Sequence, residues 1–468
     1  IAVAMVVDYD LVILGGTPEG YEAAQYATQL GARVALILQG LDGQRSPVQT
    51  QGMIWQALRP ERIDAPESDR DTVWQYAVQR ATLIADTFTR DTSPHLLIQG
   101  VDVIPEPGQI VGDRPLKVST PSRQLTTRGI LLATGSLPAA PEMPDLATIP
   151  YQTPEEFLRR ETLPSSVVIL GSDPLGLILS QILCRWGITV TLIMPQSILL
   201  NREDPQVSQW ITAQLRAEGA RLLLETAIKT VTSTDAGQIE LHLPEATVTA
   251  ETLVVAQPPM PHLSGMNLEE RLGSSSLQVN RYLQTSHPRI YACGAVMGGY
   301  RLPAIARQEA RIAVNNALFW NRQAINYCTL PYHLSTEPEM ARVGLTEPQA
   351  QQRYGASSVL VGYQPLYDMP KAHWQESTIG FCKLIAHRNG QILGGHGVGP
   401  EATEWMQALA MLMKQKVPCW KIASFPTLPD SLTDILRQTT QQWERDRWLP
   451  GQWRRDWAEN WFNWRRNA

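Results

Sequence analysis

The chain has 468 residues, of which 43% are hydrophobic and 18% charged, and its formal net charge is -5. At about 100 to 200 residues per domain this length predicts roughly three domains, and the composition is typical of a globular protein. The acidic balance provides no attraction for nucleic acid, so we expect no nucleic-acid partner. Because no stretch is apolar enough for a membrane span and no secretory signal opens the sequence, we expect a cytoplasmic protein.

The cysteines are widely scattered and include no Cys-x-x-Cys pair. They are Cys184, Cys293, Cys328, Cys382 and Cys419. This spacing argues against a disulfide framework and against a zinc site. We therefore expect no metal, and cysteines that act as small buried side chains in a reducing compartment.

The first predicted element is a short apolar strand at residues 10–14. It leads into the turn Gly15-Gly16-Thr17-Pro18-Glu19-Gly20, an alanine-rich helix at 21–30 and a second strand at 33–38. This order is the opening of a Rossmann unit, in which backbone N–H groups at the start of the helix face a pyrophosphate.

The same order returns later, with strands predicted at residues 167–170 and 188–194 around a helix that ends near Arg185. The turn between the first of these strands and the helix is Gly171-Ser172-Asp173-Pro174-Leu175-Gly176. Two such turns, each between a strand and a helix, predict two dinucleotide-sized domains.

The remaining elements complete the domain organisation. A buried strand at 129–132 ends in Ala133-Thr134-Gly135-Ser136, and a strand at 289–295 ends in Gly294 before a helix at 302–321. From residue 327 the sequence changes to short strands at 341–344, 358–363, 380–386 and 391–398, with helices near 401–416 and 431–443. These predict an α+β domain at the C-terminal end.

Four segments make the chain resemble one family, the class I pyridine nucleotide-disulfide oxidoreductases. They are GILLATGSLP at 129–138, IYACG at 290–294, TEPEMARVGLTE at 336–347 and ILGGHGVGP at 392–400. The resemblance implies an α/β fold of two Rossmann-like domains, the second inserted in the first, and a C-terminal α+β domain that forms a homodimer. We expect an FAD-type domain at 5–150 and 265–325, an NAD(P)-type domain at 151–264, a dimerisation domain at 326–436 and a helical tail at 437–468.

The chain departs from the family at both catalytic elements. The family's Cys-x-x-x-x-Cys disulfide should fall within residues 40–58, but no cysteine precedes Cys184. A thiolate is essential to that chemistry, as the donor to the flavin and as the nucleophile for exchange. Phe425 stands at the position of the family's histidine, and Asp430 keeps only the carboxylate of its glutamate partner. We therefore expect no catalytic residue here and no disulfide reductase activity.

Three of the family's FAD anchors are also changed. Thr17 replaces a glycine, Leu38 an acid and Ala295 an aspartate, which at about 1 to 2 kcal/mol each weakens FAD binding by roughly 3 to 6 kcal/mol. A Thr17 hydroxyl that donates to a phosphate would soften this loss. Two interpretations of the first glycine turn stay open: it binds FAD weakly, or its glycines are retained only because they let the helix pack on the strand. If FAD is bound, its expected contacts are Gly15, Gly16, Thr17, Gly20, Ala133, Thr134, Gly135, Gly294 and Ala295.

The second glycine turn is less suited to a nucleotide. Asp173 would direct a carboxylate at the pyrophosphate, and Met194 stands where an acid would hold the NAD ribose. We therefore do not expect NAD(P) binding.

The last 26 residues contain six tryptophans, namely Trp443, Trp448, Trp453, Trp457, Trp461 and Trp464. The last four share one face of a predicted helix, with Arg454, Arg455, Arg465 and Arg466 nearby. We favour packing of this face on the chain's own body or on its dimer partner. Docking of another protein is the functional alternative, and membrane-surface binding is a third that we do not favour.

Two functions follow from these residues. The leading hypothesis is a homodimer that has lost its redox chemistry and has a binding or scaffolding role. The alternative is an FAD-dependent NAD(P)H oxidoreductase that acts on a non-disulfide acceptor such as a quinone.

Overall fold

The computed structural model describes residues 7–39, 47–60, 69–88, 93–113, 115–139, 146, 149–268, 277–299, 302–428, 430–446, 448, 451 and 453–467. The chain divides into two compact units. The first unit comprises residues 1–176 and 228–325, and the second comprises 177–227 and 326–468. Two of the three boundaries, at 176/177 and 227/228, fall inside 151–264, the range expected for the second dinucleotide-binding domain, so compactness divides that range differently from the motifs. The third boundary lies at 325/326.

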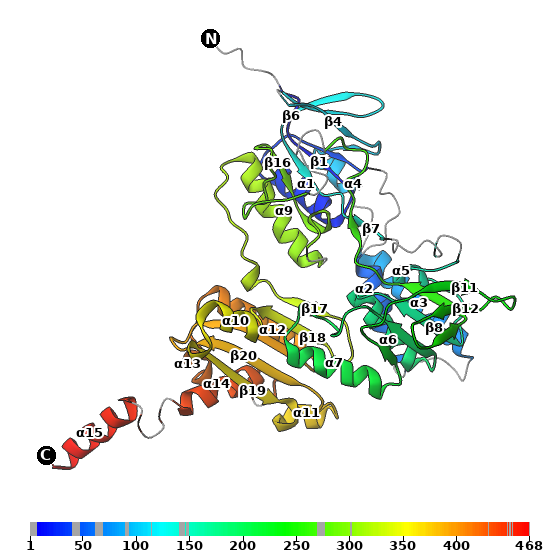
Figure 1. Ribbon diagram of the computed structural model, residues 1–468. Coiled ribbons are helices and arrows are strands. Elements are labelled where there is room, and N and C mark those ends of the chain that lie inside the picture. Colours follow the sequence, from blue (N-terminus) through cyan, green and yellow to red (C-terminus); the bar gives the residue numbers. More distant parts are fainter. Residues whose placement is uncertain are drawn as a thin grey trace, which may run out of the picture. The chain divides into compact units, whose positions relative to one another are not determined.

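A sheet with a parallel centre forms the core of the first unit (Figure 1). In spatial order its strands are β3 (Asp102–Ile104), β2 (Val34–Ile37), β1 (Tyr9–Leu14), β6 (Gln124–Leu132), β5 (Leu116–Ser119) and β4 (Gln109–Asp113), and β16 (Ile290–Ala292) also pairs with β6. The parallel register places Leu14 of β1 beside Ile37 of β2 and Leu132 of β6. The loops that follow these three strands therefore meet at one edge, where α/β sheets bind their ligands.

Apolar side chains cover both faces of this sheet. In β1, Leu11 and Ile13 belong to one hydrophobic cluster and Val12 and Leu14 to another, because successive side chains of a strand point to opposite faces. Helices α1 (Pro18–Gln29) and α9 (Pro303–Leu318) pack against each other beside the sheet (Figure 1), and α4 (Ser93–Ile98) contacts β3. A strand covered on both faces is expected to be apolar, as residues 11–14 of β1 are.

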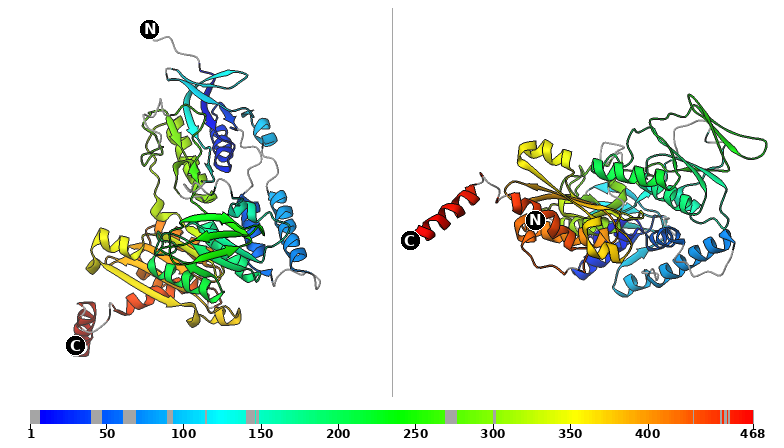
Figure 2. Two further views of the ribbon diagram at one scale, coloured as in Figure 1. Left: turned by 45° about the vertical axis from the view of Figure 1, so that its right-hand side comes forward. Right: turned by 90° about the horizontal axis from the view of Figure 1, so that it is seen from below.

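Two helices of the first unit, α2 (Pro47–Ala57) and α3 (Arg70–Phe88), lie side by side in both views of Figure 2. Trp74 of α3 is buried, and its indole N–H donates a hydrogen bond of 2.8 Å to the carbonyl oxygen of Arg160. Arg160 follows the short helix α5 (Pro154–Phe157). This contact fastens α3 to the segment that leads into the second glycine turn.

The rest of the first unit consists of small sheets. Strands β8 (Ser166–Leu170) and β14 (Thr252–Val255) are parallel, whereas β7 (Ser136–Leu137) and β15 (Met260–Pro261) are antiparallel. A second antiparallel sheet contains β11 (Thr230–Ser233), β12 (Ile239–His242) and β13 (Thr247–Ala250). The 3-10 turn η3 (Gly294–Met297) follows β16. Helix α6 (Pro174–Arg185) follows β8 along the chain, and its residues from 177 onward belong to the second unit.

An antiparallel sheet organises the second unit. In spatial order its strands are β17 (Tyr332–Leu334), β18 (Met340–Gly344), β21 (Ile392–Val398), β20 (Phe381–His387) and β19 (Val359–Pro365). The helices that follow residue 326 are η4 (Tyr327–Thr329), α10 (Glu347–Tyr354), η5 (Ala356–Ser358), η6 (Leu366–Asp368), α11 (Pro370–Trp374), α12 (Ala402–Lys414), α13 (Cys419–Ala423), α14 (Asp434–Asp446) and α15 (Trp453–Asn467). This unit also contains the parallel pair β9 (Thr189–Ile193) and β10 (Arg221–Leu223), and helix α7 (Pro205–Ala217). These elements confirm the expected fold class, a mixed α/β chain with an α+β domain at its C-terminal end.

Glycines on β21 let α12 pack directly on this sheet. A Cβ atom at Gly397 would lie 1.8 Å from the ring of Trp405, and one at Gly395 would lie 2.2 Å from Leu409. Both partners come from α12 and are fully buried. The glycine-rich segment at 392–400, which supported the family resemblance, therefore has a packing role here.

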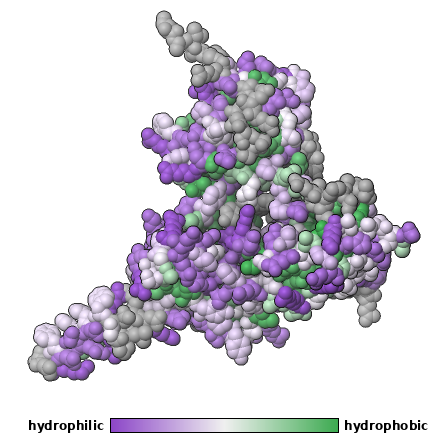
Figure 3. All heavy atoms as spheres, viewed as in Figure 1, coloured by the Kyte–Doolittle hydropathy of each residue, from purple (hydrophilic) through white to green (hydrophobic). Residues whose placement is uncertain are grey.

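The C-terminal tryptophans belong to two different environments. Trp443 of α14 is only 4% exposed and packs in the hydrophobic core, so the expected start of the tail at residue 437 falls inside a packed helix. On α15, four tryptophans are 44 to 70% exposed, namely Trp453, Trp457, Trp461 and Trp464. From the sequence we expect these rings to pack either on the chain's own body or on a dimer partner. They do not pack on the described part of the chain's own body. On the face shown in Figure 3, α15 mixes hydrophilic with near-neutral residues.

A buried ionic network joins α7 to the sheet within the second unit. Lys383 is 3% exposed, and its ammonium group lies 2.8 Å from Asp204 and 2.7 Å from Glu347. The imidazole of His396 is buried beside this network, and its Nε2–H donates a hydrogen bond of 2.9 Å to the carbonyl oxygen of Leu345. Burial lowers the pKa of His396 from 6.5 to about 4, although the charge of Asp204 opposes this shift.

The pKa of His396 predicts a loss of stability in mild acid. Because the unfolded histidine binds a proton below pH 6.5 and the folded one only near pH 4, the free energy of unfolding should fall between these values. The contribution of this group is up to about 3 kcal/mol. We expect His396→Gln to remove that part of the pH dependence in urea unfolding, and His373→Gln, at an exposed position of α11, to retain it. An identical pH dependence in both variants would contradict the prediction.

Candidate functional site

The first glycine turn lies at the carboxyl end of β1 and is held by close backbone contacts. Gly15 has a φ of +126°, and a Cβ atom there would lie 2.0 Å from the carbonyl oxygen of Ala133. A Cβ atom at Gly20 would lie 2.1 Å from the carbonyl oxygen of Gly15. Both positions thus require glycine for the turn to pack against the end of β6, whatever the turn binds.

Thr17 occupies the middle of this turn and uses its hydroxyl within the protein. It is the N-cap of α1, where its Oγ1 accepts a hydrogen bond of 3.3 Å from the N–H of Gly20. The same hydroxyl donates its proton to the carbonyl oxygen of Ala133 at 2.8 Å. The expectation that this hydroxyl could donate to a phosphate therefore does not match its position, because the chain itself supplies acceptors for its single proton, the carbonyl oxygen of Ala133 and the Glu19 carboxylate.

The other expected contacts gather around the same turn. The methyl group of Thr17 would lie 3.2 Å from a Cβ atom at Gly135, and the hydroxyl of Thr134 donates to the carbonyl oxygen of His262 at 2.6 Å. The N–H of Gly16 donates to the carbonyl oxygen of Leu38 at 3.2 Å. The structure thus brings the ends of β1, β2 and β6 together.

Glu19 is a residue of this turn that the sequence analysis did not identify as part of the site. Its side chain is buried, and its carboxyl group fills the space beside Gly294, where a Cβ atom would lie 2.2 Å from Oε1. The carboxylate has hydrogen bonds with its own N–H, with the Thr17 side chain and with the N–H of Ala295. Burial raises the pKa of Glu19, and these hydrogen bonds only partly offset that effect. An acid inside a glycine turn was the signal that could have revealed it.

A second buried carboxylate lies close to the first. Glu309 of α9 is buried, and its Oε2 accepts a hydrogen bond of 2.8 Å from the N–H of Gly294. The thiol of Cys293, next to this turn, is fully buried. Burial raises the pKa of Cys293 well above its usual range, and the charges of Glu19 and Glu309 raise it further. The end of β16 is therefore an environment that disfavours additional negative charge.

The second glycine turn has a similar arrangement. Gly171 has a φ of +117°, and a Cβ atom there would lie 2.2 Å from the carbonyl oxygen of Ala256. Asp173 is buried at the start of α6, and its carboxylate accepts a hydrogen bond of 2.9 Å from the N–H of Leu175. A carboxylate of the chain is thus bonded to an N–H group at this helix N-terminus, where a pyrophosphate would bind in a Rossmann turn.

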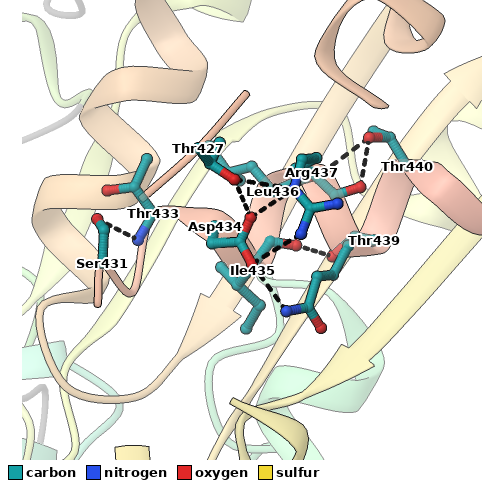
Figure 4. Close-up of polar contacts among 10 residues, drawn as sticks. Thr427, Ser431, Thr433, Asp434, Ile435, Leu436, Arg437, Thr439 and Thr440 are labelled. Carbon is teal, nitrogen blue, oxygen red and sulfur yellow. Dashed lines mark hydrogen bonds and ion pairs between the residues drawn. The ribbon is translucent and has the colours of Figure 1, made fainter. Parts of the chain in front are cut away.

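The segment at the position of the family's histidine is exposed in the second unit. Phe425 is 64% exposed, and Asp430 is exposed as well. Figure 4 shows how α14 anchors the segment: the Thr427 hydroxyl donates to Asp434, whose carboxylate also lies 2.6 Å from Nε of Arg437. Burial raises the pKa of Asp434, but the hydrogen bonds outweigh burial and leave the pKa below its usual value. The segment is therefore held in place without a proton-transfer group at residue 425.

The cysteines offer no pair for redox chemistry. The described residues contain no disulfide and no group of three metal-ligating side chains. Burial raises the pKa of Cys184 and Cys419 to about 11 and that of Cys382 to about 12. Residues 40–46, part of the range where the family places its cysteine pair, lie outside the described residues and contain no cysteine.

Comparisons with known proteins match both halves of the chain. Residues 9–310 match the family described as "Pyridine nucleotide-disulphide oxidoreductase", and residues 330–431 match its dimerisation domain. A mercuric reductase of Staphylococcus aureus is 28% identical over 87% of this chain and 77% of its own length. A dihydrolipoyl dehydrogenase of Bacillus subtilis is 28% identical over 92% of this chain and 97% of its own length.

Solved structures show the same fold. A copper(II) complex of the HOCl-induced flavoprotein disulfide reductase RclA from Escherichia coli has a TM-score of 0.79 at 22% identity, covering 93% of this chain and 100% of that one. LpdA from Mycobacterium tuberculosis has a TM-score of 0.79 at 24% identity, covering 93% and 99%. No helix of the described residues is long and apolar enough to cross a membrane.

The burial of the cysteines predicts their order of reaction with a thiol reagent. Cys328 lies in a partly exposed position, whereas Cys293 and Cys382 are fully buried thiols with raised pKa values. Because the thiolate is the reactive form, we expect iodoacetamide at neutral pH to label Cys328 first in the native protein. Peptide mass spectrometry would locate the label, and Cys328→Ser should abolish the fast phase. Fast labelling of Cys293 in the folded protein would contradict the prediction.

Proposed function

The chain belongs to the pyridine nucleotide-disulphide oxidoreductase family, and we propose that within it this protein is a homodimeric binding or scaffolding protein that does not reduce disulfides. The observation that carries the proposal is chemical: no cysteine precedes Cys184, so the flavin-side thiol pair of the family has no counterpart. Phe425 adds a second loss, because a phenyl ring cannot accept or donate the proton that an imidazole transfers.

FAD is the cofactor of the family, and the first turn fits its pyrophosphate poorly. A pyrophosphate at a helix N-terminus needs backbone N–H groups that point at it. The N–H groups of Glu19 and Ala295 already donate to the Glu19 carboxylate, and Thr17 donates its proton to Ala133. We therefore propose that FAD binds this chain weakly.

The second turn supports the same proposal for NAD(P). The Asp173 carboxylate accepts a hydrogen bond from the N–H of Leu175 at the start of α6. A pyrophosphate at this place would be repelled by the negative charge of Asp173. Met194 is buried and apolar where an acid would hold the ribose. We accordingly propose that the FAD-type region at 5–150 and 265–325 and the NAD(P)-type region at 151–264 descend from nucleotide-binding domains but no longer bind their nucleotides tightly.

Dimerisation is part of the proposal, and the match of residues 330–431 to the family's dimerisation domain supports it. Phe425 and Leu428 are 64% and 76% exposed in the single chain, which is unfavourable for large apolar side chains unless another surface covers them. A homodimer of the family type would provide that cover. The exposed tryptophans of α15 are then the surface that we propose for a protein partner, since tryptophan and arginine often anchor interfaces.

The lost thiol pair predicts the result of an enzyme assay. The purified protein, with FAD added, should show no oxidation of NADH or NADPH above buffer in the presence of lipoamide or glutathione disulfide. Phe425→His should not restore turnover, because a proton acceptor is useless without a thiol to deprotonate. Disulfide-dependent turnover would disprove the proposal. A stoichiometric flavin band that NADH bleaches would instead favour the alternative, an NAD(P)H oxidoreductase with a non-disulfide acceptor such as a quinone.

The exposure of α15 predicts that the tail is dispensable for folding. Removal of the residues after Leu449 should change the free energy of unfolding by no more than about 0.5 kcal/mol, as expected for exposed side chains. The matched control is Trp443→Ala, which empties a buried position and should cost about 3 to 5 kcal/mol. Denaturant unfolding measures both, and light scattering reports the dimer. Insoluble truncated protein would show that the tail stabilises the fold rather than binding a partner.

A further inference from the structure

We propose that the carboxylate of Glu19 is the resident anion of the first glycine turn, so that this chain occupies with its own side chain the place of a dinucleotide pyrophosphate. This inference rests on the proposed weak binding of FAD and names the residue that causes it. Thr17, Leu38 and Ala295 remove contacts that would favour the cofactor, whereas Glu19 would compete with it.

The position of Glu19 supports this assignment. Its carboxyl group lies against Gly294, in space that a Cβ atom would fill, and accepts hydrogen bonds from the N–H groups of Glu19 and Ala295. One of these donors is in the first turn of α1 and the other follows β16. N–H groups at the start of such a helix, directed at an anion, are the donors that a Rossmann turn offers to a pyrophosphate.

Local structure does not require an acid at this position. The N-cap of α1 is Thr17, whose Oγ1 already accepts the hydrogen bond from Gly20. Among the described residues, no ion pair joins Glu19 to a lysine or arginine, in contrast with Glu22 one turn along, which lies 2.7 Å from Nε of Arg311. Glu19 is therefore a buried charge whose described hydrogen-bond donors lie in the nucleotide turn and the loop beside it.

A second buried carboxylate, that of Glu309, makes it less favourable for an anionic ligand to displace Glu19. Glu309 accepts the hydrogen bond from Gly294, directly before Ala295. A diphosphate that replaced Glu19 would still lie near this charge, with little water to screen it. The site near Glu309 therefore favours the single charge of the Glu19 carboxylate over the larger negative charge of a diphosphate.

The test compares FAD affinity in the full chain and its variants. Glu19→Ala removes the carboxylate and Glu19→Gln removes only its charge, and each should tighten FAD binding by about tenfold or more. The matched control is Glu22→Gln, which removes one negative charge from the same helix and should leave the affinity unchanged. Flavin fluorescence quenching measures the affinity, and the melting temperature of each variant confirms that it is folded.

The possible outcomes separate this inference from the proposed function. If folded Glu19 variants bind FAD no more tightly than the unchanged protein, the role of Glu19 is overturned. If the unchanged protein itself binds FAD weakly, the proposed function still stands. A parent that purifies with stoichiometric flavin overturns the proposed weak binding, and the ratio of affinities still decides the role of Glu19. If Glu19→Ala does not fold, Glu19→Gln gives the answer, because its amide retains the shape of the side chain.

Discussion

The close approach of two backbones at the end of β1 is the constraint on which the first unit depends. A Cβ atom at Gly15 would meet the carbonyl oxygen of Ala133 at 2.0 Å, and one at Gly20 would meet the carbonyl oxygen of Gly15 at 2.1 Å. No side chain fits at either position, so the turn between β1 and α1 can exist only with glycine there. These glycines are therefore retained for as long as the fold is, independently of any ligand.

This constraint separates the shape of a nucleotide site from its chemistry. The turns at Gly15 and Gly171 keep the backbone path of a Rossmann site, but their polar donors are directed at carboxylates of the chain, Glu19 and Asp173. A glycine motif by itself thus reports how strands and helices pack. Whether it reports a cofactor depends on the side chains between the glycines, which the fold leaves free to change.

The second unit shows the same separation of body and chemistry. Trp405 lies on Gly397, Trp443 is buried in the core, and Lys383 is paired with Asp204 inside the unit. These contacts stabilise the domain that matches the family's dimerisation domain. Phe425, by contrast, lies on the surface of the single chain, outside this core.

The sequence by itself determined the fold class, the two glycine turns and the absence of a thiol pair, because strand and helix periodicities and the lack of a cysteine are local properties. It also identified Phe425, since that position is read from a motif. Only the tertiary structure decided that Glu19 turns inward against Gly294, that the Thr17 proton is given to Ala133, and that Trp443 is buried while the α15 tryptophans are exposed. Each of these depends on a contact between residues far apart in the chain, or on whether such a contact exists, and no local pattern encodes it.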